Sequence, residues 1–347
     1  MRLQEYLKNG KVYIIAEMSG NHDGSLEKAL RIVEAAAKAG ADCLKIQTYT
    51  ADTITIDCRS EAFRMGEGLW DNTYLYELYE KAYTPWEWTK PIMEACRENG
   101  IDFLSTPFDF TAVDFLEECG AEAYKIASFE LVDIPLIRKA AETGKPMILS
   151  CGMATEEEIE EALDAVKSTG NEQVVLLKCC SAYPTDYDTM HLRTISDMQK
   201  RFQVPIGLSD HSEGAVGAVA AVALGAKVIE KHICLSEEDK TVDSAFSLSA
   251  EEFAHLVTSV RNAERALRGV QYGPSPEEAQ SLRIRRSLYA VANIKKGEAF
   301  SKDNIRSIRP AGGLHTRYFD TLTGGKCATR DIAFGEPLRE EDVEGGL

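Results

Sequence analysis

Reactive side chains cluster at the ends of short apolar segments in this sequence. Three pairs of them are spaced two residues apart: Lys45 with Gln47, Ser209 with His211, and Glu230 with His232. Because residues two apart on a β-strand point to the same face, each pair can project into one cavity. The spacing predicts a single polar site built from several strand ends.

Two of these residues are histidines that could bind a metal ion. His211 and His232 would each supply an imidazole nitrogen to a divalent cation, leaving coordination positions for water and substrate oxygen. Two histidines without a protein carboxylate make an open site, which suits Mn²⁺, or alternatively Mg²⁺ or Co²⁺, better than structural zinc. Such an ion would polarise a carbonyl group. Taken singly, either histidine is also compatible with a structural role.

Lysines and hydroxyl groups at the same strand ends predict an anion site. Ammonium groups neutralise a phosphate or carboxylate, and hydroxyl groups donate directional hydrogen bonds to it. Burying an unpaired lysine is costly, so two buried lysines imply either paired carboxylates or an anionic ligand. The candidate residues are Lys45, Thr106, Lys125, Ser128, Ser150, Ser181 and Ser209.

Three further residues extend the candidate site. Glu17 ends the first apolar segment and could act as general acid or base, or hold a water molecule. A salt bridge to Lys45 or Lys125 would also explain it. Asp243 could bind sugar hydroxyl groups, and Tyr183 could line the same pocket.

Repeated strand and helix units must position these residues. Eight largely apolar runs, as expected for parallel strands covered on both faces, alternate with segments of helical periodicity. This order predicts an α/β fold, a (β/α)₈ TIM barrel over residues 1–268 whose strand C-termini form one site. The predicted strands are residues 12–19, 43–48, 102–106, 123–128, 146–151, 174–180, 205–211 and 227–233.

One connection departs from this rhythm. About 35 residues, rich in Trp and Tyr, separate the second strand from a helix near Pro85. Such a loop on the active face could stack on sugar rings or cover a ligand, and it could equally be an ordinary packed excursion.

The end of the chain has a different character. Residues 269–286 are predicted to be a linker, and residues 287–347 carry short strand and turn signals. The pattern of residues 294–305 returns at residues 332–343, and this duplication predicts a compact, pseudo-symmetric, β-rich domain.

Composition excludes several classes of partner. The chain has 39 Lys and Arg against 56 Asp and Glu, a formal charge of −17, which disfavours nucleic acid and acidic membranes. We expect a soluble cytoplasmic protein, since no apolar run reaches the roughly 20 residues of a membrane span and no signal-peptide pattern is present. The nine Cys show no C-x-x-C, so disulfides are not expected, and Cys179 and Cys180 are interpreted as small core residues.

Taken together, these stretches resemble the phosphoenolpyruvate-dependent sialic acid synthase family over essentially the whole chain. The C-terminal region, including residues 309–313, looks like the antifreeze-like (SAF) domain of that family. Residues 68–71 and 82–88 in the long loop most resemble the pseudaminic acid branch. The motifs that carry the resemblance are residues 16–24, 45–48, 105–109, 124–128, 207–211 and 230–232.

The resemblance implies condensation of phosphoenolpyruvate with an N-acetylated amino sugar and water, giving a nonulosonic acid and phosphate. For the pseudaminic branch, the sugar would be 2,4-diacetamido-2,4,6-trideoxy-L-altrose. His211 and His232 would bind the metal, and the lysines and hydroxyl residues named above would hold phosphoenolpyruvate. Ser181 stands where some family members have Asn, which leaves that contact open. The resemblance also implies a homodimer with exchanged C-terminal domains, in which Arg309 contacts the sugar in the partner's barrel.

Three other interpretations stay open from sequence. A synthase of the same family could make sialic or legionaminic acid instead. A metal-dependent aldolase would use pyruvate and release no phosphate. A carbohydrate-binding module would bind without turnover, but it would not explain lysines and histidines that point into a barrel.

Overall fold

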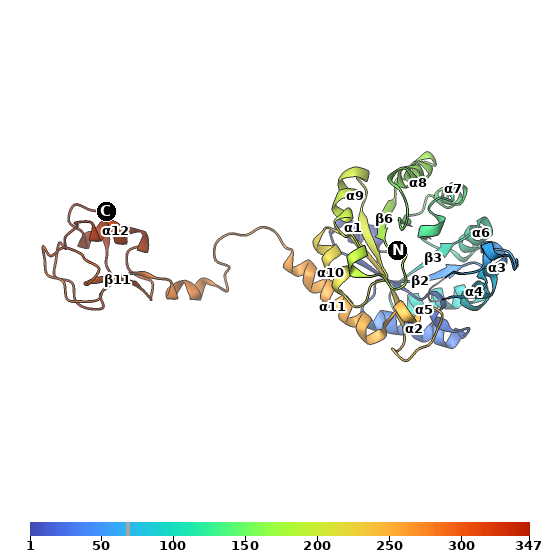
Figure 1. Cartoon of the computed structure of the whole chain (residues 1–347), viewed down its shortest axis with the longest axis horizontal. Coiled ribbons are helices and arrows are strands. Elements are labelled where there is room, and N and C mark those ends of the chain that lie inside the picture. Colours follow the sequence, from blue (N-terminus) through green and yellow to red (C-terminus); the bar gives the residue numbers. More distant parts are fainter. Residues whose placement is uncertain (67–69) are drawn as a thin grey trace. The chain divides into compact units, whose positions relative to one another are not determined.

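The computed structural model describes residues 1–66 and 70–347, and the chain divides into two compact units, residues 1–268 and 269–347. The first unit is a closed barrel of parallel strands, in which β1 pairs with both β2 and β8 (Figure 1). This confirms the predicted TIM barrel. Its strands are β1 (Tyr13–Glu17), β2 (Cys43–Thr48), β3 (Asp102–Pro107), β4 (Tyr124–Ile126), β5 (Met147–Ser150), β6 (Val174–Cys179), β7 (Ile206–Asp210) and β8 (Val228–Cys234), with the short β9 (Leu248–Ser249) paired to β8.

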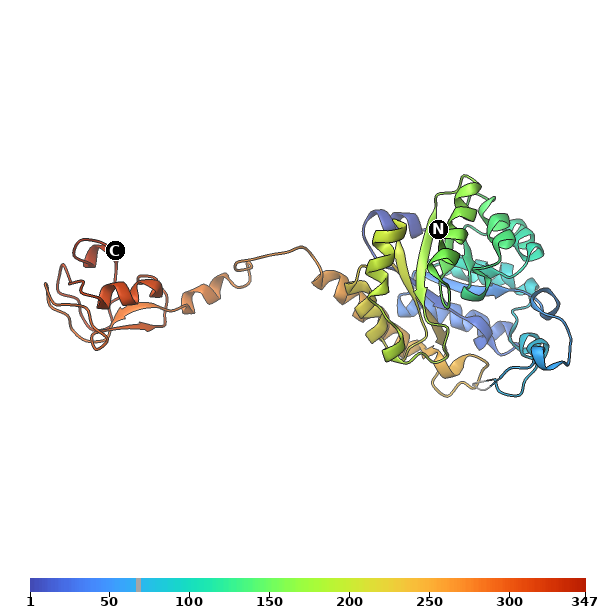
Figure 2. The same cartoon turned by 45° about the horizontal axis from the view of Figure 1, so that its top comes forward.

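Helices surround the strands on the outside of the barrel (Figure 2). Local signals set their ends: the Ser25 side chain accepts a hydrogen bond from the Lys28 amide at 3.2 Å, and Gly40 ends the same helix with φ 91°. In the described ranges, no helix is long and apolar enough to cross a membrane. The outer helices are α2 (Leu26–Ala39), α5 (Thr89–Glu98), α6 (Phe110–Cys119), α7 (Ile134–Ala141), α8 (Glu156–Ser168), α9 (Thr194–Phe202), α10 (Val216–Ala223) and α11 (Ala250–Ala266).

The barrel interior has an apolar lower layer. Leu3 from helix α1 (Leu3–Lys8) belongs to this layer and caps it from the N-terminal end of the barrel. Side chains alternate along a strand, so residues two positions apart point to the same face. The residues that follow the last member of this layer on each strand by two positions therefore also point into the barrel, and most of them are polar. The apolar layer consists of Leu3, Tyr13, Ile15, Cys43, Leu104, Ala123, Ile148, Val175, Leu177 and Val228.

A close approach inside this layer gives a stability prediction. A Cβ added at Gly207 on β7 would lie 2.5 Å from Leu177 Cδ2 and 2.8 Å from Val228 Cβ. We expect Gly207→Ala to lower the free energy of unfolding by about 1–3 kcal/mol, because the packed interior must shift to admit a methyl group. Urea unfolding of both proteins measures this, and equal midpoints would contradict the predicted clash.

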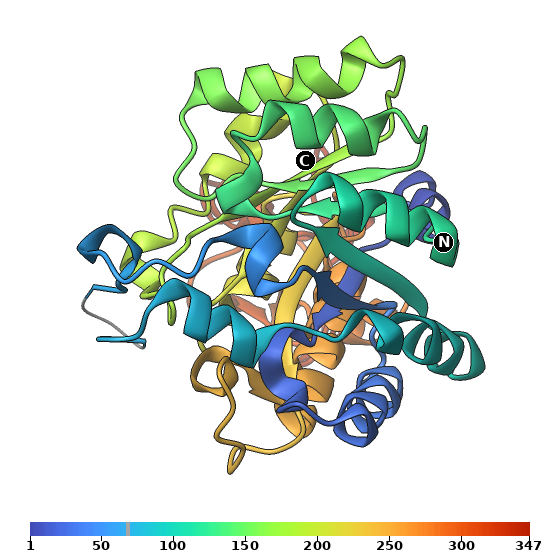
Figure 3. The ribbon, with the colours of Figure 1, turned by 90° about the vertical axis from the view of Figure 1, so that its right-hand side faces the viewer.

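The long connection after β2 is more ordered than a plain loop. It contains α3 (Ala51–Ile54), α4 (Leu75–Ala82) and the 3₁₀ turns Glu61–Phe63 and Trp86–Trp88 (Figure 3). The Trp86 indole donates to the Tyr49 carbonyl at 3.1 Å, and the Trp70 indole donates to the Val242 carbonyl at 3.2 Å. The excursion is thus packed onto the active face. The motif residues Gly68 and Leu69 lie outside the described residues.

The second unit has its own core and internal symmetry. It contains the antiparallel pair β10 (Ser287–Ala290) and β11 (Ile305–Ile308), and the short helix α12 (Phe319–Thr323). The repeat residues Ile294 and Ile332 exchange two backbone hydrogen bonds of 2.9 Å each. Equivalent residues of the two halves therefore pair with one another, as a pseudo-two-fold relation requires. The core includes Leu288, Phe300, Ile305, Leu322 and Leu338.

Candidate active site

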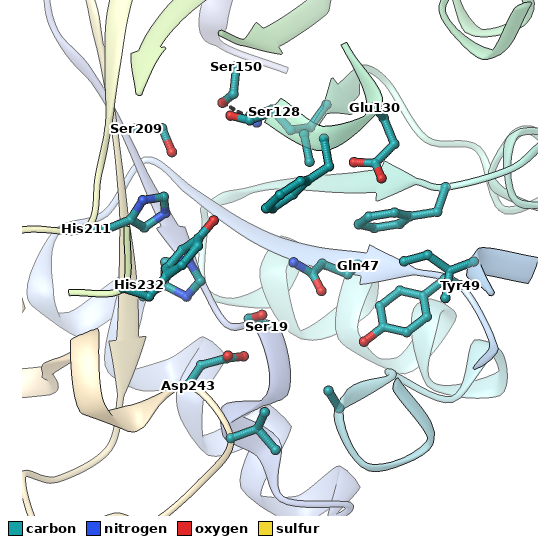
Figure 4. A pocket seen from close by; sticks show the side chains of 18 of the residues that line it. Ser19, Gln47, Tyr49, Ser128, Glu130, Ser150, Ser209, His211, His232 and Asp243 are labelled. Atoms are coloured by element: carbon teal, nitrogen blue, oxygen red, sulfur yellow. Dashed lines mark hydrogen bonds between the residues drawn. The ribbon is translucent and has the colours of Figure 1, made fainter. Parts of the chain in front are cut away.

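A cavity of about 220 Å³ lies at the C-terminal ends of the barrel strands (Figure 4). Strand ends supply its polar wall, and the α3–α4 excursion supplies an apolar wall that includes Met65, Trp70 and Tyr79. Most of the residues selected from sequence converge here. Those lining the cavity are Lys45, Gln47, Lys125, Ser128, Ser150, Tyr183, Ser209, His211, His232 and Asp243.

A buried charge cluster contains three residues that line the cavity, Lys45, Lys125 and Glu230, and one that does not, Glu17. Lys45 Nζ lies 2.8 Å from Glu230 Oε1 and 3.2 Å from Glu17 Oε2, and Lys125 Nζ lies 3.8 Å from the same oxygen of Glu230. None of these four side chains is more than 4% exposed. Two lysines and two acidic side chains thus share one buried cluster, and Glu17 does form the salt bridge to Lys45 that the sequence allowed.

The two carboxylates of this cluster differ in pKa. Burial raises the pKa of Glu17 to about 7, helped by the charge of Glu230 and opposed by Lys45. Burial would also raise the pKa of Glu230, but Lys125 and Lys45 outweigh it and hold that pKa below its usual value. Burial lowers the pKa of Lys125 to about 8. Glu17 is therefore the carboxyl group suited to exchange a proton near neutral pH, while Glu230 stays ionised.

Hydroxyl groups surround the lysines. Lys125 Nζ donates to Ser150 Oγ at 2.6 Å, and Ser209 Oγ donates to Glu230 Oε1 at 3.4 Å. Ser128 Oγ accepts a hydrogen bond from the Gly152 amide at 3.0 Å, which leaves its own proton free to donate to a ligand.

Two predicted hydroxyl residues do not line the cavity. Thr106 on β3 pairs in register with Gln47 but is not among the lining residues, and within residues 1–66 and 70–347 its buried Oγ1 has no hydrogen-bond partner. Ser181 lies beside Ser128, since the Oγ atoms of both residues are close to the position that a Cβ on Gly152 would take, but Ser181 is not among the lining residues. Direct ligand contacts of both residues stay predictions.

The two histidines face each other with ring centroids 5.3 Å apart. His211 Nδ1 lies 2.9 Å from the Cys180 carbonyl and donates a hydrogen bond to it, so in the neutral ring Nε2 is the nitrogen that carries the lone pair. The buried Nδ1 of His232 has no hydrogen-bond partner among the described residues. Tyr183 and Phe246 pack against the imidazoles at centroid distances of 4.5 and 4.8 Å and fix the ring planes.

Asp243, from the segment after β8, also lines the cavity. Its Oδ2 accepts the Gly20 amide at 2.9 Å, and burial raises its pKa. Asn21 ties this region to β8, because its side chain donates to the Ile233 carbonyl at 2.8 Å and accepts from the Thr241 hydroxyl. Asn21 therefore helps to hold the segment that contains Asp243, and it does not line the cavity itself.

The cavity also contains residues that strand spacing did not select. Cys179 lines it, with Sγ 3.9 Å from His211 Nδ1, and so is more than the core residue expected. Glu130 follows β4 in a 3₁₀ turn, where no strand periodicity could identify it. Burial raises its pKa to about 7, and its buried Oε2 has no hydrogen-bond partner in the part of the chain described. Ser19 also lines the cavity. It falls within the predicted first strand, residues 12–19, but β1 ends at Glu17 and Ser19 begins a 3₁₀ turn.

Arg309 belongs to the C-terminal unit and is exposed directly after β11. Its contact with a sugar in a partner's barrel stays a prediction.

Comparison with known proteins gives consistent matches over both units. The NeuB family matches residues 32–272, and the SAF domain matches residues 285–344. A pseudaminic acid synthase of Campylobacter jejuni is 46% identical over 342 residues, covering 99% of each chain. A pseudaminic acid synthase of Helicobacter pylori is 38% identical over 335 residues, covering 96% of this chain and 98% of that one.

Solved structures agree with the sequence matches. The crystal structure of the spore coat polysaccharide biosynthesis protein spsE from Bacillus subtilis superposes with a TM-score of 0.65 at 33% identity. The alignment covers 96% of this chain and 95% of that one. With a family match over more than half of its length and relatives of this identity, the chain belongs to the NeuB family.

Proposed function

We propose that this chain is a pseudaminic acid synthase that condenses phosphoenolpyruvate with 2,4-diacetamido-2,4,6-trideoxy-L-altrose and water, giving pseudaminic acid and phosphate. The observation that carries the reaction class is the convergence of Lys45, Lys125, Glu230 and two neighbouring imidazoles in one cavity, with Glu17 in salt-bridge contact with Lys45. The choice of sugar rests on the 46% identity to the Campylobacter jejuni enzyme of that name.

In this proposal the lysines hold the enol ester. Lys45 and Lys125 neutralise its carboxylate and phosphate, and the hydroxyls of Ser128, Ser150 and Ser209 add directional hydrogen bonds. Thr106, which pairs in register with Gln47, would supply a further hydroxyl group. Gln47 and Asp243 face the same space from other walls and would bind the polar groups of the sugar.

The carboxylates then assist the chemistry. The terminal carbon of phosphoenolpyruvate attacks the open-chain aldehyde, and positive charge develops at the enol carbon. Ionised Glu230 would stabilise that charge. Glu17 accepts a proton from the water that adds to this carbon, a role suited to its pKa of about 7. The tetrahedral adduct expels phosphate by cleavage of the C–O bond.

We propose a divalent cation, Mn²⁺ or alternatively Mg²⁺ or Co²⁺, at His211 and His232. The residues fit this role, because the His211 Nδ1 hydrogen bond to Cys180 leaves Nε2 free as a ligand and the two rings face each other. Within the ranges described, no cluster of three or more His, Cys, Asp or Glu side chains is arranged for a metal, so two nitrogens would hold the ion and leave the remaining positions open. When bound, the cation would polarise the aldehyde carbonyl.

We expect His211→Ala to weaken Mn²⁺ binding by at least about 100-fold and to abolish metal-stimulated turnover, because one of two nitrogen ligands is lost. His255→Ala is the matched control, since His255 is an exposed histidine on α11. Isothermal titration of Mn²⁺ into each metal-free protein measures the effect. Near-normal affinity in His211→Ala would contradict the ligand assignment.

We further propose a homodimer with exchanged C-terminal domains, in which Arg309 contacts the sugar in the partner's barrel. Mixed dimers of His211→Ala and Arg309→Ala subunits test this. With exchange, one of the two sites combines an intact barrel with an intact Arg309, so the mixed dimer recovers up to half of the wild-type activity. Without exchange, every site keeps one defect and mixing restores none.

A panel of amino sugars offered with phosphoenolpyruvate tests the function. We expect phosphate release with the trideoxy-altrose diamide and little with N-acetylmannosamine. Preference for N-acetylmannosamine would overturn the choice of sugar, and turnover of pyruvate without phosphate release would overturn the reaction class.

A further inference from the structure

Strands β7 and β8 carry a buried ion pair on the face opposite to the cavity. Asp210 and Lys231 are direct partners in the parallel ladder, and both side chains are 0% exposed. Because side chains alternate along a strand, a pair that points into the helix layer requires its flanking residues to point into the cavity. Those flanking residues are Ser209, His211, Glu230 and His232, which all line it.

Several contacts tie this pair to the segment after His211. Lys231 Nζ lies 3.0 Å from Asp210 Oδ2 and also donates to the Ser212 carbonyl. Asp210 Oδ1 accepts the Ser212 amide at 2.9 Å and the Ser212 hydroxyl at 2.6 Å. Ser212, which follows His211, is thereby bound to Lys231, which precedes His232.

Helix α10 closes this network from outside. A Cβ on Gly217 would lie 2.9 Å from Ser212 Oγ and 3.1 Å from Asp210 Oδ2, so the helix backbone packs directly on the pair. The charges therefore have little freedom to rearrange.

We propose that Asp210 and Lys231 are positioning residues that fix the spacing and orientation of His211 and His232 from behind the strands. The inference rests on the metal role proposed for those histidines. Stability alone does not explain the pair, because burying two charges costs several kcal/mol and apolar residues of similar volume often stabilise as well or better. An apolar pair cannot reproduce the directional hydrogen bonds to Ser212. These bonds hold the backbone next to His211, whose ring is hydrogen-bonded to the Cys180 carbonyl.

The neutral double variant Asp210→Asn with Lys231→Met separates positioning from charge burial. We expect a folded full-length protein in which the His211 ring N–H exchanges with water about 10-fold faster, seen in spectra of ¹⁵N-histidine-labelled protein. The Mn²⁺ dissociation constant should rise about 10- to 100-fold, the range typical for groups that orient metal-ligating histidines. A folded double variant with wild-type exchange and wild-type affinity would overturn the proposal.

Ser212→Ala provides a milder variant that removes one hydroxyl contact and keeps both charges. It should shift both measurements in the same direction by a smaller factor, and wild-type values for both would count against the proposal even if the double variant fails to fold.

Arg261→Met is the matched control. It breaks the 2.6 Å ion pair with Asp42 at the N-terminal end of the barrel. We expect a lower melting temperature with unchanged ring N–H exchange and Mn²⁺ affinity. If Arg261→Met also changed the ring N–H exchange rate and the Mn²⁺ affinity, these two measurements would report general stability. The inference would then be overturned. The wild-type protein could bind no Mn²⁺ while the double variant still shows faster ring N–H exchange. That outcome would support the positioning role and refute the proposed metal site.

Discussion

Glu17→Gln is expected to lower kcat by about 10²- to 10⁴-fold, the usual contribution of a positioned acid or base. The amide keeps the shape of the side chain but cannot accept a proton from water. Lys45 keeps its 2.8 Å salt bridge to Glu230, so its ammonium group is not left unpaired in the variant. Steady-state kinetics with a thermal melt of the variant measure the effect and check the fold.

The pH profile supplies the sharper test of the same residue. Glu17 with a pKa of about 7 is ionised above that pH and protonated below it, so wild-type kcat/KM should fall as the pH drops through about 7. The variant should lack this acidic limb. Glu130→Gln is the matched control, because Glu130 lines the same cavity and its pKa is also raised to about 7. If the limb disappears in Glu130→Gln and persists in Glu17→Gln, the assignment of the base is wrong.

Lys125→Met is expected to lower kcat/KM for phosphoenolpyruvate by roughly 30-fold to several thousand-fold, since truncating one partner of a buried charge contact costs about 2–5 kcal/mol. In the wild type, the pKa of about 8 means that Lys125 loses its charge as the pH rises through 8. An alkaline limb near that pH should therefore be present in the wild type and absent in the variant. Initial rates at varied phosphoenolpyruvate and pH give both results.

Lys178→Met is the control for this prediction. Lys178 also ends a strand, but it lies on the opposite face from Cys179, and its Nζ donates to the Cys179 carbonyl at 2.7 Å. We expect the KM for phosphoenolpyruvate to stay within about 2-fold in this variant. Equal losses in both variants would show that the effect is not specific to the proposed anion site.

The sequence predicted the barrel and its inward-facing residues well because both follow from local periodicity. Runs such as residues 43–48 contain their own strand signal, and the spacing of Glu230 and His232 places both on one face. The segment 26–39 carries its own capping residues, Ser25 and Gly40, so its ends could be predicted to the residue.

Features that depend on contacts between distant segments could not be predicted. Glu130 and Ser19 lie in turns whose orientation is set by the elements around them. The excursion after β2 was predicted as a loop, but it contains α3 and α4, whose packing on the mouth is a tertiary effect. Likewise, the pairing of Lys45 with Glu230, distant in sequence, arises only when the barrel closes.

The fate of the bridging oxygen of phosphoenolpyruvate tests the central claim most directly. With ¹⁸O at the bridge between the enol carbon and phosphorus, attack of water at the enol carbon and loss of phosphate by C–O cleavage should transfer the label to inorganic phosphate. Mass spectrometry of both products measures this. Label retained in the sugar acid would mean P–O cleavage and would contradict the proposed roles of Glu17 and Glu230.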